Sequence, residues 1–379
     1  MDKTEVLRKY FGHTEFRSGQ GDIIDNILSG RDCLGVMPTG AGKSVCYQVP
    51  ALMMDGVTIV LSPLISLMKD QVESLRQAGV SAAFINSSLS QYEADDVFYK
   101  ASAGEYRILY VAPERLETEG FMRLCEKIRI PLVAVDEAHC VSHWGQDFRP
   151  SYLRIEGFIS SLPERPVVAA FTATATDVVR EDIVRILRLR DPFSVTTGFD
   201  RANLYFEVRK PKDKDAELLS IVKSASGGST IIYCSTRKAV ESVCAMLRLN
   251  DINAAMYHAG LKDNERRLAQ NDFIYDRCNV MVATNAFGMG IDKSDVSLVV
   301  HYNMPKDIES YYQEAGRAGR DGGPARCILL YAKKDVHTAE YLIDNGHEDA
   351  GLSIQELNEL RARDRERLKQ MTFYSTTTR

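Results

Sequence analysis

Hydrophobic and polar positions along the chain fall into two alternating kinds of segment. Short apolar runs rich in valine, isoleucine and leucine are separated by longer stretches in which apolar residues recur every three or four positions. The short continuous runs are typical of strands buried on both faces, and the longer stretches are typical of amphipathic helices. The pattern therefore predicts an α/β protein whose sheets are mostly parallel and flanked by helices.

This alternation occurs in each half of the chain, without a visible sequence repeat. In the first half the predicted strands are Cys33–Met37, Val57–Ser62, Ala82–Asn86, Ile108–Ala112, Leu132–Asp136 and Val167–Thr172. In the second half they are Thr230–Cys234, Ala254–Tyr257, Val280–Ala283, Leu298–Tyr302 and Arg326–Tyr331. The predicted helices include Gly19–Ser29, Ser66–Ala78, Gln91–Ala101, Ala175–Leu187, Lys238–Leu249, Glu265–Asp276 and Ile308–Ala315.

The pattern is interrupted near the middle of the chain. The strand-like run Leu204–Val208 is followed by Arg209–Asp215, which is charged and poorly periodic. We place a domain boundary just before this run, near Thr196–Arg201, because charge and lost periodicity mark a connection between domains. The expected domains are residues 1–198 and residues 199–345.

The strand alternation stops beyond Lys333. The charged stretch Leu352–Gln370 predicts one or two helices within a C-terminal helical segment of residues 346–379. The last residues, Thr376–Arg379, are typical of an end that frays or has been cut.

Composition narrows the class of protein. Hydrophobic residues make up 45% of the chain and charged residues 26%, which is ordinary for a soluble globular protein. No apolar run is long enough to span a membrane and the N-terminus has no apolar signal core, so we expect a cytoplasmic protein, nucleoid-associated in a bacterium or nuclear in a eukaryote, with no membrane partner. The net charge of −5 means that any nucleic-acid contact comes from a local groove.

Cysteine spacing argues against a structural metal. The eight cysteines are scattered and form no Cys-x-x-Cys pair, so we expect neither a zinc site nor a disulfide framework.

The segment Met37–Ser44 predicts a phosphate-binding loop between a strand and a helix. Its sequence is Met-Pro-Thr-Gly-Ala-Gly-Lys-Ser. Small residues let backbone N–H groups wrap phosphate oxygens, and the helix N-terminus adds its positive end. Lys43 would reach the β- and γ-phosphates and Ser44 would bind Mg²⁺. The nucleotide-binding residues expected here are Thr39, Gly40, Ala41, Gly42, Lys43 and Ser44, although the strict pattern has glycine where this chain has Met37.

Two acidic residues follow another predicted strand. Asp136 ends the apolar run Leu132–Val135, and Glu137 comes next. A carboxylate at the carboxyl end of a parallel strand faces the ligand crevice of an open α/β sheet. We therefore expect Asp136 to hold Mg²⁺ through water and Glu137 to orient and deprotonate the attacking water.

Arginines in the second half complete the expected hydrolysis site. Arg317 and Arg320 are three residues apart, so they would share a face if the preceding helix continued. Arginines supplied by a second domain can neutralise charge on a transferred phosphoryl group. We expect Arg320 to be the arginine finger, with Arg317 supporting it and Gln313 as a further catalytic residue.

The N-terminal region suggests a base-binding site. A glutamine amide has one donor and one acceptor group, which match the edge of adenine. Gln20 would then select ATP, with Arg17 nearby and His13 stacked on the ring. Taken alone, each residue also fits an ordinary surface or helix-terminal position.

An aromatic-rich segment follows the acidic pair. Residues 138–152 read Ala-His-Cys-Val-Ser-His-Trp-Gly-Gln-Asp-Phe-Arg-Pro-Ser-Tyr. In sequence and position this segment resembles the loop that follows the Asp-Glu-Ala-His box in the RecQ family of DNA helicases, within superfamily two. Trp144 and Phe148 would stack on bases and Arg149 would bind phosphate, independently of sequence.

Further segments extend the resemblance from about Phe11 to about Tyr331. They are residues 61–71, 110–115, 171–175, 232–237, 257–260 and 283–292. The resemblance implies tandem RecA-like domains, with Asp292 at the nucleotide. It also implies strand contacts by Ser62, Arg115, Thr236 and Thr284.

The implied activity is ATP- and Mg²⁺-dependent unwinding of DNA with 3′-to-5′ polarity, in repair and recombination, on single-stranded and forked substrates. Two features depart from the family: His13 stands where an aromatic residue is common, and no cysteine-rich zinc module or winged helix follows. Three alternatives remain open. They are a DNA-stimulated ATPase with little unwinding, an RNA-directed ATPase, and a nucleotide-gated DNA-binding module without turnover.

Overall fold

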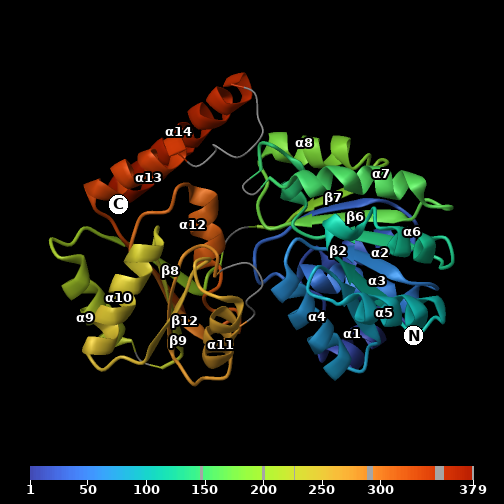
Figure 1. The fold of residues 1–379 in the computed structure, drawn as a ribbon, viewed down its shortest axis with the longest axis horizontal. Helices are drawn as coiled ribbons and strands as arrows, with labels where there is room; N and C mark the ends of the chain where they lie inside the picture. The colour runs from blue at the N-terminus through green and yellow to red at the C-terminus, as the bar shows by residue number, and fades with distance from the viewer. Residues whose placement is uncertain (146–147, 199–200, 226, 288–292, 346–353, 378–379) are drawn as a thin grey trace. The chain divides into compact units, whose positions relative to one another are not determined.

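The computed structural model describes residues 1–145, 148–198, 201–225, 227–287, 293–345 and 354–377. The chain divides into two compact units, Met1–Phe199 and Asp200–Arg379, each built on a parallel sheet flanked by helices (Figure 1). In both units the strands are short, and those inside each sheet are almost entirely buried, because helices cover both faces of the sheet.

The first unit contains a seven-stranded sheet in the order β3-β4-β2-β5-β6-β1-β7. Its strands are β1 (Cys33–Val36), β2 (Thr58–Leu61), β3 (Ala82–Ile85), β4 (Ile108–Val111), β5 (Leu132–Val135), β6 (Val167–Thr172) and β7 (Phe193–Thr196). Its α-helices are α1 (Lys3–Phe11), α2 (Gln20–Leu28), α3 (Lys43–Met53), α4 (Ile65–Gln77), α5 (Gln91–Ser102), α6 (Glu119–Cys125), α7 (Arg154–Ser161) and α8 (Asp177–Ile186). Three 3₁₀ turns are η1 (Pro113–Arg115), η2 (Ala138–Val141) and η3 (Pro150–Leu153).

Alternate residues of each strand enter two separate hydrophobic cores. In β5, Val133 and Val135 pack with α5 to α8, whereas Leu132 and Ala134 pack with α1 to α4. This two-sided burial explains why the strand sequences are continuously apolar.

The second unit contains a six-stranded sheet in the order β10-β11-β9-β12-β13-β8. Its strands are β8 (Leu204–Arg209), β9 (Ser229–Tyr233), β10 (Ala254–Tyr257), β11 (Val280–Ala283), β12 (Val296–His301) and β13 (Ala325–Leu330). Its helices are α9 (Lys214–Ser224), α10 (Arg237–Leu249), α11 (Asp263–Ile274), α12 (Ile308–Ala315), α13 (Lys333–Asn345) and α14 (Ile354–Thr376). All strand pairings given for the described residues of both sheets are parallel.

The predicted α/β class is confirmed, and the predicted strands agree with the observed ones to within two residues at each end. Strand β7 was not predicted. It lies at the edge of the sheet beside β1, so its residues alternate between half-buried and exposed and the run is not continuously apolar. The charged C-terminal stretch forms one helix, α14, which packs through Leu368 and Met371 against α13 and Tyr311.

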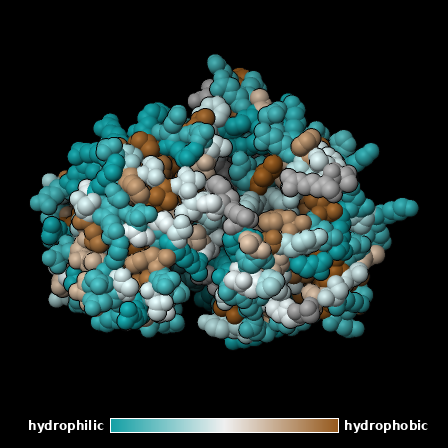
Figure 2. Space-filling model, turned by 180° about the vertical axis from the view of Figure 1, so that it is seen from behind, coloured by the Kyte–Doolittle hydropathy of each residue, from teal (hydrophilic) through white to brown (hydrophobic). Residues whose placement is uncertain are grey.

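Hydrophobic residues are interspersed with hydrophilic ones on the face drawn in Figure 2. Among the residues that the structure describes, no helix combines the length and the apolar character needed to cross a membrane.

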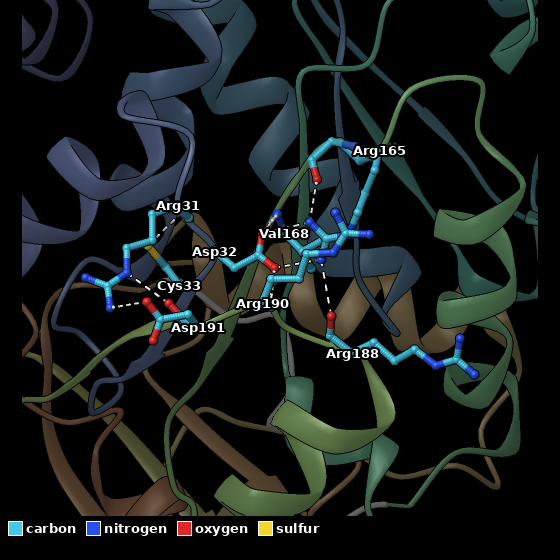
Figure 3. Close-up of polar contacts among 9 residues, drawn as sticks. Arg31, Asp32, Cys33, Arg165, Val168, Arg188, Arg190 and Asp191 are labelled. Carbon is cyan, nitrogen blue, oxygen red and sulfur yellow. Dashed lines mark hydrogen bonds and ion pairs between the residues drawn. The ribbon is translucent and has the colours of Figure 1, made fainter.

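A buried carboxylate ties together the strand beginnings opposite the phosphate loop (Figure 3). Asp32 precedes β1 and is 2% exposed, and its two oxygens accept hydrogen bonds from Arg165 at 3.1 and 2.6 Å. The same carboxylate accepts from Val168 N at 2.9 Å and from Arg190 N at 2.7 Å. Because these residues precede or begin β6 and β7, Asp32 holds three neighbouring strands at their starts.

We expect Asp32→Ala to lower the free energy of unfolding of the first unit by about 3–5 kcal/mol. The substitution leaves the partly buried Arg165 guanidinium and the amides of Val168 and Arg190 without their hydrogen-bond acceptor. Trp144, the chain's one tryptophan, lies in this unit, so urea unfolding followed by its fluorescence measures the change. The control is Arg31→Ala, which removes an exposed pair with Asp191 and should cost about 1 kcal/mol or less. Equal losses of unfolding free energy in the two variants would contradict the stabilising role proposed for Asp32.

Candidate functional site

The loop between β1 and α3 has the geometry of an anion cradle. Gly40 and Gly42 have φ of 83° and 78°, in the left-handed region that favours glycine. Gly42 caps α3 without any side-chain hydrogen bond, so the first amides of α3 are left for a ligand. Met37, which replaces a glycine of the strict pattern, is completely buried in the core behind the loop. The departure therefore leaves the cradle intact.

Two N-terminal residues brace this loop from outside. The Arg17 guanidinium donates to Gly40 O, and Gln20 Nε2 donates to Ala41 O at 3.0 Å and Gly42 O at 3.1 Å. Gln20 Oε1 accepts from Arg17 N at 2.8 Å. Both the nitrogen and the oxygen of the Gln20 amide are thus hydrogen-bonded within the protein. To bind the edge of adenine, Gln20 would have to exchange these bonds for bonds to the base.

His13 is exposed beyond the end of α1. The adenine roles of His13 and Gln20 stay predictions.

The acidic pair lies at the carboxyl end of β5. Asp136 is 8% exposed, and its N–H donates to Leu61 O at 2.9 Å. Burial, with a smaller contribution from the Glu137 charge, raises the pKa of Asp136 to about 7, and Lys43 opposes the rise. A carboxylate that is costly to ionise when alone is suited to a bound cation, since a nearby positive charge favours the ionised form.

Glu137 is held in an unusual backbone conformation. Its φ of 48° is left-handed, which costs a non-glycine residue about 1–2 kcal/mol. Its Oε2 is buried with no hydrogen-bond partner, 3.4 Å from His139 Nδ1. A strained residue with a buried, unsatisfied acceptor is typical of a reactive position, and this acceptor can take a proton.

His139 connects the acidic pair to the next strand. Its Nδ1 lies 2.9 Å from Thr172 Oγ1 at the end of β6. The Thr172 hydroxyl in turn donates to Thr174 O at 3.0 Å. The acidic pair and the segment 171–175 are therefore linked by side-chain contacts, in addition to the pairing of β5 with β6.

These groups fit a magnesium nucleotide. Lys43 donates to Met37 O at 3.1 Å beneath the loop, and Ser44 lies half-buried in the first turn of α3. The uncapped amides and Lys43 suit phosphate oxygens, and the Ser44 hydroxyl and Asp136 suit Mg²⁺. Among the described residues, no group of three or more His, Cys, Asp or Glu side chains is arranged to hold a metal ion.

The aromatic loop, residues 142–149 without the undescribed 146–147, presents side chains beside the acidic pair. Trp144 is 42% exposed. Phe148 stacks on His143 with ring centroids 3.8 Å apart, and Arg149 Nη1 donates to Pro63 O at 3.1 Å. An exposed indole and a stacked aromatic pair near a guanidinium suit unpaired bases and their phosphates.

The residues predicted to contact a DNA strand differ in exposure. Arg115 is half-buried and donates to Asn86 O at 3.1 Å, and Thr236 caps α10 by accepting from Ala239 N. Thr284 is 9% exposed, whereas Ser62 is completely buried and its hydroxyl has no hydrogen-bond partner in the structure. In this conformation Ser62 cannot touch a DNA strand, so the predicted contact would need a conformational change. The four assignments stay predictions.

The two arginines lie beyond the end of the preceding helix, so the condition for a shared helical face is not met. Helix α12 ends at Ala315, and Arg317 and Arg320 lie in the turns that follow. Arg317 is 5% exposed, Arg320 is half-buried, and Gln313 lies half-buried on α12 itself. Gly316 is the C-cap residue of α12, and Gly319 adopts a left-handed φ of 58° in the turns that follow.

Residues just after the unit boundary hold this arginine-bearing turn. Arg201 donates to Ala318 O at 3.0 Å and Gly319 O at 2.7 Å. Asn203 Nδ2 donates to Gly319 O at 2.9 Å and Gly323 O at 2.8 Å. The sequence analysis missed both residues, because a lone arginine and asparagine more than 100 positions from their partners carry no local signal.

Asp292, predicted at the nucleotide, lies outside the described residues.

Comparison with known proteins places both units. Residues 17–182 match the DEAD/DEAH box helicase family, and residues 213–322 match the helicase conserved C-terminal domain. The probable ATP-dependent DNA helicase RecS of Bacillus subtilis is 37% identical over 372 residues, which is 96% of this chain and 74% of that protein. The ATP-dependent DNA helicase RecQ of the same species is 45% identical over 98% of this chain and 62% of its own length.

This chain belongs to the RecQ family of superfamily-two helicases. It spans little more than half the length of several RecQ relatives. Its architecture of tandem RecA-like domains also matches yeast Dbp5 bound to RNA and ADP BeF3, with a TM-score of 0.70 over 96% of this chain and 97% of that one. At 20% identity this match shows the fold alone.

Membership in the RecQ family confirms the resemblance inferred from the motifs and implies ATP as the nucleotide, usually with Mg²⁺. The roles of the individual residues stay predictions.

Proposed function

We propose that this chain is an ATP-driven DNA motor that hydrolyses Mg²⁺-ATP in response to single-stranded DNA. It would move 3′ to 5′ and separate forked duplexes during repair and recombination. One observation supports this most directly: the buried, unsatisfied Glu137 Oε2 lies next to a buried carboxylate that interacts with the phosphate-loop lysine. A pure binding module needs no such proton acceptor.

In the proposed mechanism, the α3 amides and Lys43 bind the phosphates and orient the terminal phosphoryl group. Bound Mg²⁺ would supply positive charge at the phosphate oxygens, with Ser44 and Asp136 as its protein partners. Glu137 orients a water molecule and accepts its proton as the oxygen attacks. Arg317 and Arg320 neutralise charge on the transferred group when the second unit brings them to the nucleotide.

On the DNA side, Trp144 and Phe148 stack on bases and Arg149 contacts phosphate, without sequence preference. The loop follows Glu137 after only the single turn η2. A DNA strand bound to this loop can therefore affect Glu137 through a short segment of described residues.

The deciding experiment measures ATP hydrolysis by this chain with no nucleic acid, with a DNA strand and with an RNA strand of the same sequence. We expect DNA to stimulate hydrolysis and RNA to stimulate it less, because the two strands differ at the 2′-hydroxyl. A forked-duplex assay on the same chain tests strand separation. Nucleotide-sensitive DNA binding without turnover would refute the proposal, and equal stimulation by RNA would move the substrate class to RNA.

We expect Trp144→Ala to lower stimulation by single-stranded DNA about tenfold, because stacking on one base is worth about 1–3 kcal/mol. The measurement is the ratio of DNA-stimulated to basal hydrolysis at saturating ATP. Tyr92→Ala removes another exposed aromatic ring of the first unit and should leave the ratio unchanged. A normal ratio in Trp144→Ala would remove the loop from the mechanism.

A further inference from the structure

A single hydroxyl joins the aromatic loop to helix α8. Ser142 is completely buried. Its Oγ donates to Asp182 Oδ2 at 2.6 Å and accepts from Trp144 N at 3.0 Å. Only a group that is both donor and acceptor can make these two bonds at once, which a hydroxyl does. The backbone of the tryptophan is therefore tied, through Ser142, to a carboxylate on α8.

Asp182 is a strong anchor for this hydroxyl. It is 8% exposed and also accepts from Arg185 at 2.5 Å. Burial alone would raise the pKa of Asp182, but the hydrogen bonds from Ser142 and Arg185 and the nearby His143 lower it below its ordinary value. The group is thus an ionised acceptor, and hydrogen bonds to ionised acceptors are stronger than neutral ones.

The other side of Ser142 is tied to the acidic pair. Ser142 N donates to His139 O at 3.2 Å, and Gly145 N donates to Ser142 O at 2.9 Å. A Cβ on Gly145 would lie 2.2 Å from His139 O, so the chain passes too closely there for any other residue. His139 itself lies 3.4 Å from Glu137 Oε2. The segment from Glu137 to Trp144 is therefore closely packed, and Ser142 is bonded both to Trp144 and to His139, which lies beside Glu137.

We propose that Asp182 is a positioning residue for Trp144: through Ser142 it holds the tryptophan in a fixed place relative to Glu137, so that a strand stacked on the indole stimulates hydrolysis. This inference rests on the proposed function for its DNA-stimulated step. No role in contacting nucleotide or DNA is assigned to Ser142 or Asp182. They act by holding the loop at a fixed position relative to Asp136 and Glu137.

The first readout needs neither DNA nor ATP. Trp144 is the only tryptophan, so its fluorescence anisotropy and acrylamide quenching report the loop directly. In Ser142→Ala and in Asp182→Ala the anisotropy should fall and the quenching should rise, because the backbone of Trp144 loses its anchor. Ser160→Ala, which removes an exposed hydroxyl bonded to Glu156 on α7, is the matched control and should change neither quantity.

The second readout is the ratio of DNA-stimulated to basal hydrolysis. Ser142→Ala should lower this ratio about tenfold, the effect expected from losing one charge-assisted hydrogen bond. Asp182→Asn keeps an amide oxygen that can accept from Ser142, so it should lose less stimulation than Asp182→Ala. This graded series guards against a variant that simply fails to fold.

Unchanged anisotropy in Ser142→Ala would overturn the positioning role, and a changed anisotropy with full stimulation would overturn its link to hydrolysis. A wild-type chain that DNA does not stimulate would instead refute the proposed function, and the anisotropy series would still decide whether Asp182 positions Trp144.

Discussion

Glu137→Gln is expected to bind ATP normally and to lose turnover by about 10³-fold or more. The amide keeps the size of the side chain and its place in the left-handed turn, but it cannot accept a proton from the attacking water. General base catalysis is worth about 10²–10⁴-fold, and a pre-strained, buried acceptor such as Glu137 Oε2 places this case towards the upper end. The measurement is kcat at saturating ATP and DNA, together with binding of a fluorescent ATP analogue.

The matched control for this variant is Glu117→Gln. Glu117 pairs with Arg154 on the exposed surface of the same unit, so the same chemical change there should leave kcat within about twofold of wild type. If Glu137→Gln turned over at the wild-type rate, the proton acceptor would have to be another group. Loss of ATP binding in Glu137→Gln would point to a binding role instead.

Arg320→Ala is the second large expected effect, a fall in kcat of about 10³-fold with little change in ATP affinity. An arginine supplied to the transferring phosphoryl group acts mainly on charge that develops in the transition state, and such residues are worth about 10³–10⁵-fold. Arg320 is the better test of the pair because Arg317 is 5% exposed, and truncating a buried side chain also disturbs packing. Arg320→Lys should not restore the rate, because an ammonium lacks the planar, forked donors of guanidinium.

Arg326→Ala is the control for charge loss in the second unit. Arg326 pairs with Glu207 on β8 and is partly exposed, so its loss should leave kcat within about twofold of wild type. A wild-type kcat in Arg320→Ala would exclude this residue as the finger and leave Arg317 as the remaining candidate. A rise in the dissociation constant for ATP without a fall in kcat would assign Arg320 to ground-state binding.

Much of the fold was predictable because its signals are local. Continuous apolar runs marked every strand except β7, whose position at the sheet edge leaves alternate residues exposed. The phosphate loop and the acidic pair could also be predicted from the sequence, because each lies directly after a buried strand. Helix α12 ends at Ala315, as predicted, so the continuation that would have put Arg317 and Arg320 on one helical face does not occur.

The α/β class, the order of the elements and the residue types at the expected phosphate, acid and arginine positions follow from the amino-acid sequence, because they depend on spacings of a few residues. Which distant side chains support these positions depends on how the chain folds. Gln20 braces a loop 21 residues away, Asp182 reaches Ser142 across 40 residues, and Arg201 reaches Gly319 across 118. Such contacts depend on which strands become neighbours, as when β1 lies between β6 and β7, and chain order alone does not specify that arrangement.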